Sequence, residues 1–291
     1  MHHWPVGAGQ VRFRRLLRTE PRPDQEEDPD QQHKDAEPEV DVDNAGCDQL
    51  GGESRPELVV QLVEQGRITE ERIDISVRGL LREKFILGLL DNPYVDPDQA
   101  AATVGKAEFV AAGADAQRRA YTLLTNHDQI LPLRRGCRLY LEGVSDEVAS
   151  HYGDVVNDPA DADVALLRLK APYEPRPGGF EAMFHAGSLE FPVAERDHHG
   201  AICAAAPTIA DVYLDRPAVL TDLAEQAAAL LGSYGSSDEA LLDIVFGIAQ
   251  PEGSLPFDLP RSMAAVEASR SDVPFDTADP VFKFGHGLRY G

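Results

Sequence analysis

The segment VALLRLKAPYEPR, residues 164–176, carries the clearest fold signal in the chain. Its first six residues form a nearly continuous apolar run, which is typical of a strand that other elements cover on both faces. Prolines and polar residues follow at once, so the strand is expected to end in a loop. The segment therefore predicts one buried strand of a parallel sheet, with a polar loop at its carboxyl end.

Short elements of both kinds flank this strand from Leu131 to Phe246. Strands are predicted at 138–141, 209–214 and 231–234, and helices at 145–151, at 202–206, from Pro217 to Leu230, and after Ser236. The last helix carries a capping-box pattern, with Ser236 at its start and Glu239 three residues on. Such alternation favours the α/β class, with a mainly parallel sheet sandwiched between two layers of helices.

Helical spacing dominates the part of the chain that precedes this region. Apolar residues after Pro56 predict one helix, Thr69 is expected to cap a second, and a third is predicted from about 106 to 124. Residues 18–45 are rich in acidic residues and prolines and contain no aromatic residue, which predicts disorder. The expected domains are a disordered or remnant acidic segment at 1–45, a helical region at 46–105 and an α/β domain at 106–291.

The composition narrows the classes of partner and cofactor. A formal net charge of −23 over 291 residues disfavours nucleic acid and anionic membrane surfaces. No apolar run reaches the length of about 18 residues that a membrane span needs, and no secretion signal is visible, so a cytoplasmic location is expected. The three cysteines lack CxxC spacing, and His185, His198 and His199 are interpreted as solvated or core histidines rather than metal ligands. No metal or other cofactor is predicted.

Polar residues follow each of three predicted strands. Glu174 and Arg176 come after the first of these strands, Asp215 and Arg216 after the second, and Asp238 after the third. Ligands of parallel sheets bind beyond the carboxyl ends of the strands, so these side chains are expected to share one rim. Carboxylates and guanidinium groups suit sugar hydroxyls, which both donate and accept hydrogen bonds. Structural roles stay open, because Asp238 would also stabilise a helix start and Asp215 with Arg216 would also suit a surface pair.

Six longer motifs run in order from about residue 46 to residue 291. The helical region contains GCDQLGGE (46–53), VEQGRITEERID (63–74) and LREKFILGLLDNPYVD (81–96). The α/β region contains AQRRAYTLLTNHDQILPL (116–133), GSSDEALLDIVFGIAQPEGSLPFDLPRS (235–262) and FKFGHGLRY (282–290). The first three resemble the end of the N-terminal domain of family 3 glycoside hydrolases, and the last three resemble that family's C-terminal domain.

The resemblance implies β-glucosidase-like hydrolysis of β-linked glycosides with retention. It also implies two domains: a barrel that carries a nucleophilic Asp, usually in an Asp-Trp pair, and an α/β sandwich that lends a Glu as general acid/base. Retention requires two carboxyl groups about 5–5.5 Å apart. Pro172-Tyr173-Glu174 is similar to a Pro-Tyr-x-Glu loop of the family but is one residue shorter, which makes Glu174 the candidate general acid/base. Glu181 and Glu190 stay open as alternatives on the same loop.

The chain departs from the family's pattern in its first third. A (β/α)₈ barrel takes roughly 250 residues, whereas about 105 residues precede the predicted α/β domain. The single tryptophan, Trp4, follows His3, so the chain has no Asp-Trp pair. We therefore expect the nucleophile to be missing.

Three interpretations stay open. In the first, the chain is a glycoside hydrolase by descent, now a fragment or a subunit, with a carbohydrate as its substrate. In the second, it is a non-catalytic carbohydrate-binding or partner domain that docks on a separate barrel domain, or associates with itself, through the apolar faces of the helices at 56–103. In the third, a rearranged reading frame has replaced the original start of the sequence.

Overall fold

The computed structural model describes residues 46–49, 56–270 and 272–290. The chain divides into two compact units, residues 1–101 and 102–291, which are called the N-terminal and the C-terminal unit below. The acidic segment 1–45, with the predicted disorder of residues 18–45, lies outside the described residues. Among the helices that are described, none is both long enough and apolar enough to cross a membrane.

The described part of the N-terminal unit contains helices around a small apolar cluster. Helices α2 (Pro56–Glu64) and α3 (Glu70–Ile86) belong to it, and α4 (Pro97–Thr103) crosses the boundary between the units. Leu58, Leu62 and Ile68 form the buried cluster. The cap predicted for α3 is confirmed, because the Thr69 hydroxyl accepts a hydrogen bond from the Arg72 N–H at 3.2 Å.

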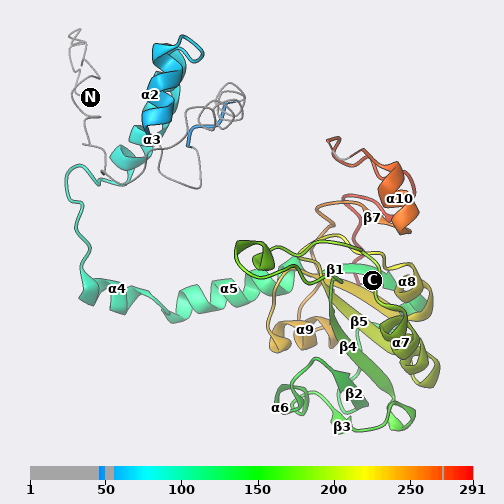
Figure 1. The fold of residues 1–291 in the computed structure, drawn as a ribbon. Helices are drawn as coiled ribbons and strands as arrows, with labels where there is room; N and C mark the ends of the chain where they lie inside the picture. Colours follow the sequence, from blue (N-terminus) through cyan, green and yellow to red (C-terminus); the bar gives the residue numbers. More distant parts are fainter. Residues whose placement is uncertain (1–45, 50–55, 271, 291) are drawn as a thin grey trace. The chain divides into compact units, whose positions relative to one another are not determined.

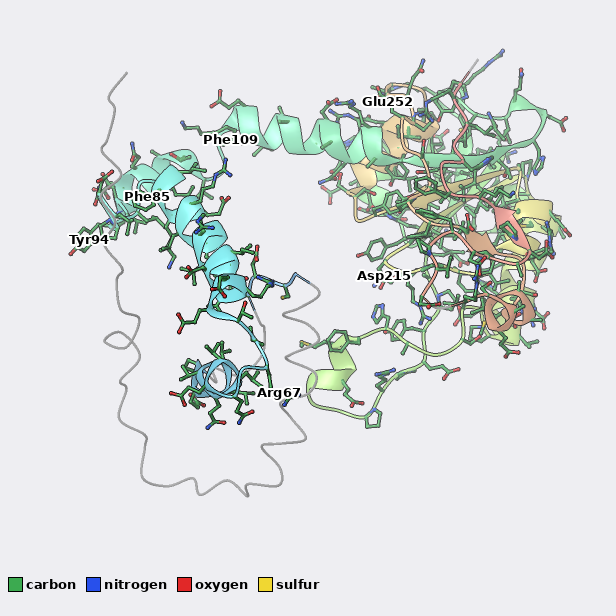
Figure 2. All side chains as sticks on the ribbon, turned by 90° about the horizontal axis from the view of Figure 1, so that it is seen from above. Arg67, Phe85, Tyr94, Phe109, Asp215 and Glu252 are labelled. Atoms are coloured by element: carbon green, nitrogen blue, oxygen red, sulfur yellow. The ribbon has the colours of Figure 1, made fainter. Side chains whose placement is uncertain are left out.

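Ile73 near the start of α3 packs against this apolar cluster, whereas most apolar side chains farther along the helix are exposed. Ser76 is the buried residue of this helix, whereas Phe85 is 67% exposed (Figure 2). The other exposed apolar side chains of α3 and of the turn after it are Ile75, Leu80, Leu81, Ile86, Leu87, Leu89 and Leu90. Several exposed apolar side chains on one helix and the turn after it are typical of a site of interaction.

A six-stranded sheet forms the centre of the C-terminal unit (Figure 1). Its strands are β1 (Thr122–Asn126), β2 (Arg138–Glu142), β3 (Asp154–Val156), β4 (Val164–Lys170), β5 (Thr208–Tyr213) and β6 (Ala229–Ser233). The order across the sheet is β1-β6-β5-β4-β2-β3, and every neighbouring pair is parallel except β1 with β6. β4 and β5 therefore lie side by side inside the sheet.

Helices cover both faces of the sheet, which confirms the predicted fold class. The helices are α5 (Ala107–Ala120), α6 (Asp146–Ala149), α7 (Val193–Ala205), α8 (Thr221–Gln226), α9 (Asp238–Val245) and α10 (Met263–Ala268), with 3₁₀ turns at His127–Gln129, Pro159–Asp161 and Phe180–Met183. On one face, α6 and α9 pack against Leu166 and Ile209. On the other face, α8 packs against Val212 and α7 against Leu167. Alternate residues of each strand thus enter different apolar layers.

The C-terminal tail returns to the antiparallel edge of the sheet. Before it, β7 (Leu259–Pro260) and β8 (Pro280–Phe282) form a separate two-stranded ribbon. The Leu288 N–H then donates to the Leu123 carbonyl at 2.8 Å in an antiparallel bridge. His286 Nε2 is hydrogen-bonded to the Leu124 carbonyl at 2.8 Å. The tail therefore covers the side of β1 that faces away from β6.

One predicted helix is wrong at its C-terminal end. The helix expected over 106–124 ends at Ala120, and the residues that follow form β1. Leu123 and Leu124 are both buried, on opposite faces of the sheet, and only an extended backbone places successive side chains in this way. The short elements α4 and β3 were also not predicted, because three to seven residues carry little periodicity.

Two further errors concern the region around β6. The helix predicted from Pro217 to Leu230 is the much shorter α8, and Leu230 instead lies in β6, fully buried between β5 and β1. Ser237 rather than Ser236 caps α9, with its hydroxyl accepting a backbone N–H of the first turn at 3.2 Å. The two adjacent serines are equivalent in sequence, but the Ser236 hydroxyl is hydrogen-bonded to the Tyr121 hydroxyl.

Candidate functional site

The candidate site begins with the loop after β4, residues 171–192, which we call the strap. The Glu174 N–H donates to the Ala186 carbonyl at 2.8 Å, and this bridge closes the strap on itself. Glu174 Oε1 also accepts the Ser188 N–H at 3.3 Å. Gly187 has φ +78°, and a Cβ there would lie 2.5 Å from the Glu174 carboxyl carbon. The Glu174 side chain is thus folded back on the closing end of the strap.

The loop after β5 holds the strap through two successive residues. Asp215 Oδ2 is hydrogen-bonded to His185 Nδ1, and Arg216 Nη2 donates to the Gly187 carbonyl at 2.9 Å. The Tyr173 ring stacks on the His185 ring, with centroids 3.8 Å apart and planes within 7°. Figure 2 labels Asp215, which lies on the side of the C-terminal unit where the strap leaves the sheet. Strap and loop form one polar cluster at the carboxyl edge of β4 and β5.

The predicted site residues are divided between two places. Glu174, Asp215 and Arg216 belong to the cluster at the strap. Arg176 is exposed on the strap. Asp238 lies in the first turn of α9, where it accepts the Ser145 N–H at 2.9 Å, so it contacts the loop after β2 instead. The single rim expected from the sequence is therefore two clusters, one along the strap and one around Asp238.

The alternative acids on the strap differ in their surroundings. Glu181 is exposed in the 3₁₀ turn of the strap. Glu190 Oε1 accepts the Met263 N–H at 3.4 Å and so contacts the start of α10. The Glu190 contact does not involve His185 or Gly187, the residues that Asp215 and Arg216 hold in place.

Asp238 is part of a buried ionic network that the sequence did not predict. Arg168 in β4 pairs with Asp238, and its Nη2 donates to the Ser236 carbonyl at 2.5 Å and hydroxyl at 2.9 Å. Arg168 Nε lies 3.3 Å from Oδ2 of Asp211, its neighbour in register on β5. Asp211 is 1% exposed. The network joins two central strands to the start of α9 and, through Ser236 and Tyr121, to the end of α5.

Burial dominates the electrostatics of this network. It raises the pKa of Asp211 to about 6, although the Arg168 guanidinium opposes that shift. Burial likewise raises the pKa of Tyr121. A sequence signal did exist for this network, because Arg168 and Asp211 each interrupt an apolar strand that is covered on both faces. Charged residues are almost never fully buried unless they are paired. Opposite charges in two neighbouring buried strands therefore predict an ion pair between them.

The histidines and cysteines outside the strap have structural contacts. His198 Nε2 is hydrogen-bonded to Glu142 Oε1 at 2.9 Å, and His199 is buried edge-on to Phe191, where burial lowers its pKa. All three cysteines are free thiols. Within residues 46–49, 56–270 and 272–290, no group of three or more His, Cys, Asp or Glu side chains is arranged to hold a metal ion.

Known proteins resemble this chain in sequence. The pattern of the glycosyl hydrolase family 3 C-terminal domain matches residues 137–290. Probable beta-glucosidase C of Aspergillus flavus is 57% identical over 251 residues, which cover 85% of this chain and 40% of that protein. The periplasmic beta-glucosidase/beta-xylosidase of Dickeya chrysanthemi is 42% identical over 258 residues, which cover 87% of this chain and 39% of that protein. The chain thus spans about 40% of the length of these relatives.

Solved structures share the fold at lower sequence identity. A β-glucosidase from Erythrobacter marinus superposes with a TM-score of 0.63 at 21% identity, covering 88% of this chain and 45% of that one. A β-glucosidase from Listeria innocua gives a TM-score of 0.59 at 20% identity, covering 79% of this chain and 40% of that one. The α/β arrangement described above is therefore a known architecture.

Proposed function

The chain belongs to glycosyl hydrolase family 3, and from this membership we propose that it forms the α/β part of a β-glucosidase-type active site. The proposed reaction is hydrolysis of β-linked O-glycosides with retention, in which a nucleophile attacks the sugar while a second group protonates the leaving oxygen. In this proposal a barrel-like domain outside the chain supplies the nucleophile. The chain supplies the proton-transferring group and the contacts to sugar hydroxyls.

One observation carries this proposal. The strap cluster brings two carboxylates, an imidazole and a guanidinium together at the carboxyl edge of a parallel sheet, where ligands of such sheets bind. Glu174 is the general acid/base that the sequence predicts, with Asp215 and Arg216 as sugar-binding residues. Arg176 and Asp238 were predicted to bind sugar as well. Asp238 contacts Arg168 and Ser145 instead of the strap, which makes it the weaker candidate of the two.

A second candidate role, docking on a barrel-like domain, is favoured by the exposed apolar side chains of α3. The match covers 40% of the A. flavus relative, and the rest of that protein is the proposed occupant of the α3 surface. Self-association of the chain is the competing outcome. Sedimentation of the chain alone, and then with the unmatched N-terminal part of the A. flavus relative, separates the two.

The proposed function is tested by reconstitution. The full chain and the unmatched N-terminal part of the A. flavus relative are purified separately and assayed, alone and mixed, with an aryl β-glucoside. We expect hydrolysis in the mixture and none with the chain alone, because retention needs both reacting groups. A matched control is Asp279→Asn, which changes an exposed carboxylate paired with Arg261 away from the strap. Turnover by the chain alone, or a stable but inactive complex, contradicts the proposal.

A further inference from the structure

We propose that Met263 is a reversible oxidation site and that its thioether sulfur is a redox-sensitive anchor of the strap. When a peroxide oxidises this sulfur, the C-terminal end of the strap detaches from α10. The inference concerns control over the position of the strap and does not depend on the reaction proposed above.

Two reciprocal hydrogen bonds join the strap to the start of α10. The Leu189 N–H donates to Met263 Sδ at 3.3 Å, and the Met263 N–H donates to Glu190 Oε1 at 3.4 Å. The Leu189 carbonyl accepts the Val219 N–H at 2.8 Å, so the same residue is also tied to the loop after β5. Leu189 is buried, and a buried backbone N–H needs an acceptor. The sulfur of Met263 is that acceptor.

The sulfur is held in place from the side of α10. Met263 is the first residue of this helix, and the Ser262 hydroxyl caps it by accepting the Ala265 N–H at 3.2 Å. The Arg261 carbonyl accepts a hydrogen bond from the Thr221 hydroxyl at 2.7 Å, which ties the start of α10 to the start of α8. Oxidation of the sulfur alters neither contact. The strap is therefore held or released by the chemistry of the sulfur, while the helix stays in place.

Oxidation changes the sulfur in a way that its contact with the strap does not tolerate. Met263 is partly exposed, so a small oxidant reaches it. A thioether is a weak acceptor in an apolar side chain, whereas a sulfoxide is polar and carries one more oxygen atom. That oxygen finds no free space beside the buried Leu189, because protein interiors are close-packed. The oxidised side chain therefore turns toward water, and the Leu189 N–H loses its acceptor.

The oxidation step balances with a hydroperoxide as the co-reactant. A lone pair of Met263 Sδ attacks the hydroxyl oxygen of the hydroperoxide, the O–O bond breaks, and an S–O bond forms. The hydrogen of that hydroxyl passes to the leaving oxygen, which departs as an alcohol, or as water when the oxidant is hydrogen peroxide. Sulfur is thus oxidised by two electrons and the peroxide is reduced by two. Methionine sulfoxide reductases reverse the change, with one enzyme for each sulfoxide epimer.

A second methionine on the strap provides an internal control. The chain has three methionines, Met1, Met183 and Met263. Met183 is 66% exposed in the 3₁₀ turn of the strap, whereas Met1 lies outside the described residues. Because Met183 is more exposed than Met263, it is expected to react first. Its oxidation is expected to leave the contact between Leu189 and Met263 in place.

Treatment of the full chain with graded hydrogen peroxide tests the inference. Peptide mass spectrometry measures the sulfoxide fraction at each methionine, and amide exchange followed by nuclear magnetic resonance measures the protection of single residues. The exchange rate of the Leu189 amide is expected to rise about two- to tenfold in step with the Met263 sulfoxide, since that factor corresponds to one net hydrogen bond. The rate at Ala210, a fully buried residue of β5, is expected to stay unchanged. Incubation with both reductases is expected to restore the original Leu189 rate.

Two leucine variants separate the contributions of the two methionines. In Met183→Leu, the Leu189 amide is expected to respond to peroxide as it does in the wild type. Met263→Leu removes the sulfur at nearly constant side-chain volume. In that variant the Leu189 amide is expected to exchange as fast before peroxide as in the oxidised wild type, and peroxide is expected to add nothing.

Three results overturn the inference. If Met263 stays reduced while Met183 is fully oxidised, the sulfur is not an oxidation site. If the Leu189 rate does not follow the Met263 sulfoxide, or still responds to peroxide in Met263→Leu, the sulfur is not the anchor. If the Ala210 rate rises together with the Leu189 rate, oxidation unfolds the C-terminal unit instead of releasing the strap. Glycoside hydrolysis enters none of these measurements, so the proposed function is tested separately.

Discussion

Helices α3 and α9 both carry clear apolar stripes but lie in opposite environments. α3 has 17 residues, of which Ser76 is buried, whereas α9 has 8 residues and buries five of them. The α9 stripe packs against the central sheet, with Leu241, Leu242 and Val245 in the same core cluster as Leu166. The comparison shows that an apolar stripe predicts that a helix packs against another surface. It does not predict which surface that is. The docking role proposed above assigns the α3 stripe to the part of the relatives that this chain does not match.

The largest effect on stability is expected for the buried ionic network around Arg168. Arg168→Met removes the cation between Asp211 and Asp238 and leaves a fully buried carboxylate without its partner. Breaking a buried pair in this way costs about 3–5 kcal/mol of unfolding free energy. Urea denaturation followed by circular dichroism at pH 8 measures it. A loss below about 1 kcal/mol would mean that water reaches Asp211 and that the core around it is open.

The next largest effect on stability is expected from the difference in side-chain burial between α9 and α3. Leu242 in α9 is 0% exposed, so Leu242→Ala is expected to cost about 3 kcal/mol through lost burial and a residual cavity. The matched change in α3, Leu81→Ala, removes the same atoms from a side chain that is 42% exposed and is expected to cost less than about 1 kcal/mol. Equal losses in the two variants, measured by urea denaturation, would show that the α3 stripe is already packed in solution.

The pH dependence of the unfolding free energy isolates the contribution of Asp211. The pKa of Asp211 is raised from 3.8 to about 6, so the folded state keeps the proton to a higher pH than the unfolded chain does. Its contribution to stability is therefore complete below about pH 3.8 and is lost as the pH rises through about 6. The loss is on the order of 2–3 kcal/mol.

Asp211→Asn removes this titration and is the matched variant for that measurement. Its unfolding free energy relative to wild type is expected to rise between pH 4.5 and 7.5, because the wild type alone must ionise a buried group. A difference that stays flat across this range would indicate that Asp211 is ionised throughout and that Arg168 outweighs burial.

The smallest effect on stability is expected on the α3 surface. Phe85→Lys combined with Leu81→Lys should change the unfolding free energy by less than about 0.5 kcal/mol, because both side chains are exposed. The same variant should bind the unmatched part of the A. flavus relative at least about tenfold more weakly, since apolar anchors dominate such interfaces. Unchanged binding in sedimentation experiments would exclude the α3 stripe as the docking surface.

The sequence predicted the layers of the fold better than the details of the site. Periodicity sufficed for β4, β5 and α9, whose apolar residues pack within the C-terminal unit. It failed at Leu123 and Leu124, where burial on both faces of a strand looks the same as a buried helical turn. Of the site residues, Glu174 and Asp215 were expected at a shared edge because they follow parallel strands.

What could not be predicted depends on how the strap folds. Nothing in the local sequence says that Asp215 will meet His185, thirty positions earlier, or that Glu174 will turn back on Ser188. These contacts follow from a loop of some twenty residues closing on itself, and loop closure carries no periodic signal. The Arg168–Asp211 pair, by contrast, does have a sequence signal, because each residue places a charge in an apolar strand.

The tail that runs along β1 affects the tendency of the protein to aggregate through its sheet edge. An uncovered edge strand offers its backbone as a template on which other copies can polymerise. Here the Leu288 N–H already occupies the Leu123 carbonyl, and the opposite edge, β3, is three residues long. Proteolytic trimming of the tail is therefore expected to open the β1 edge to pairing with other copies, even with the loops after β4 and β5 untouched.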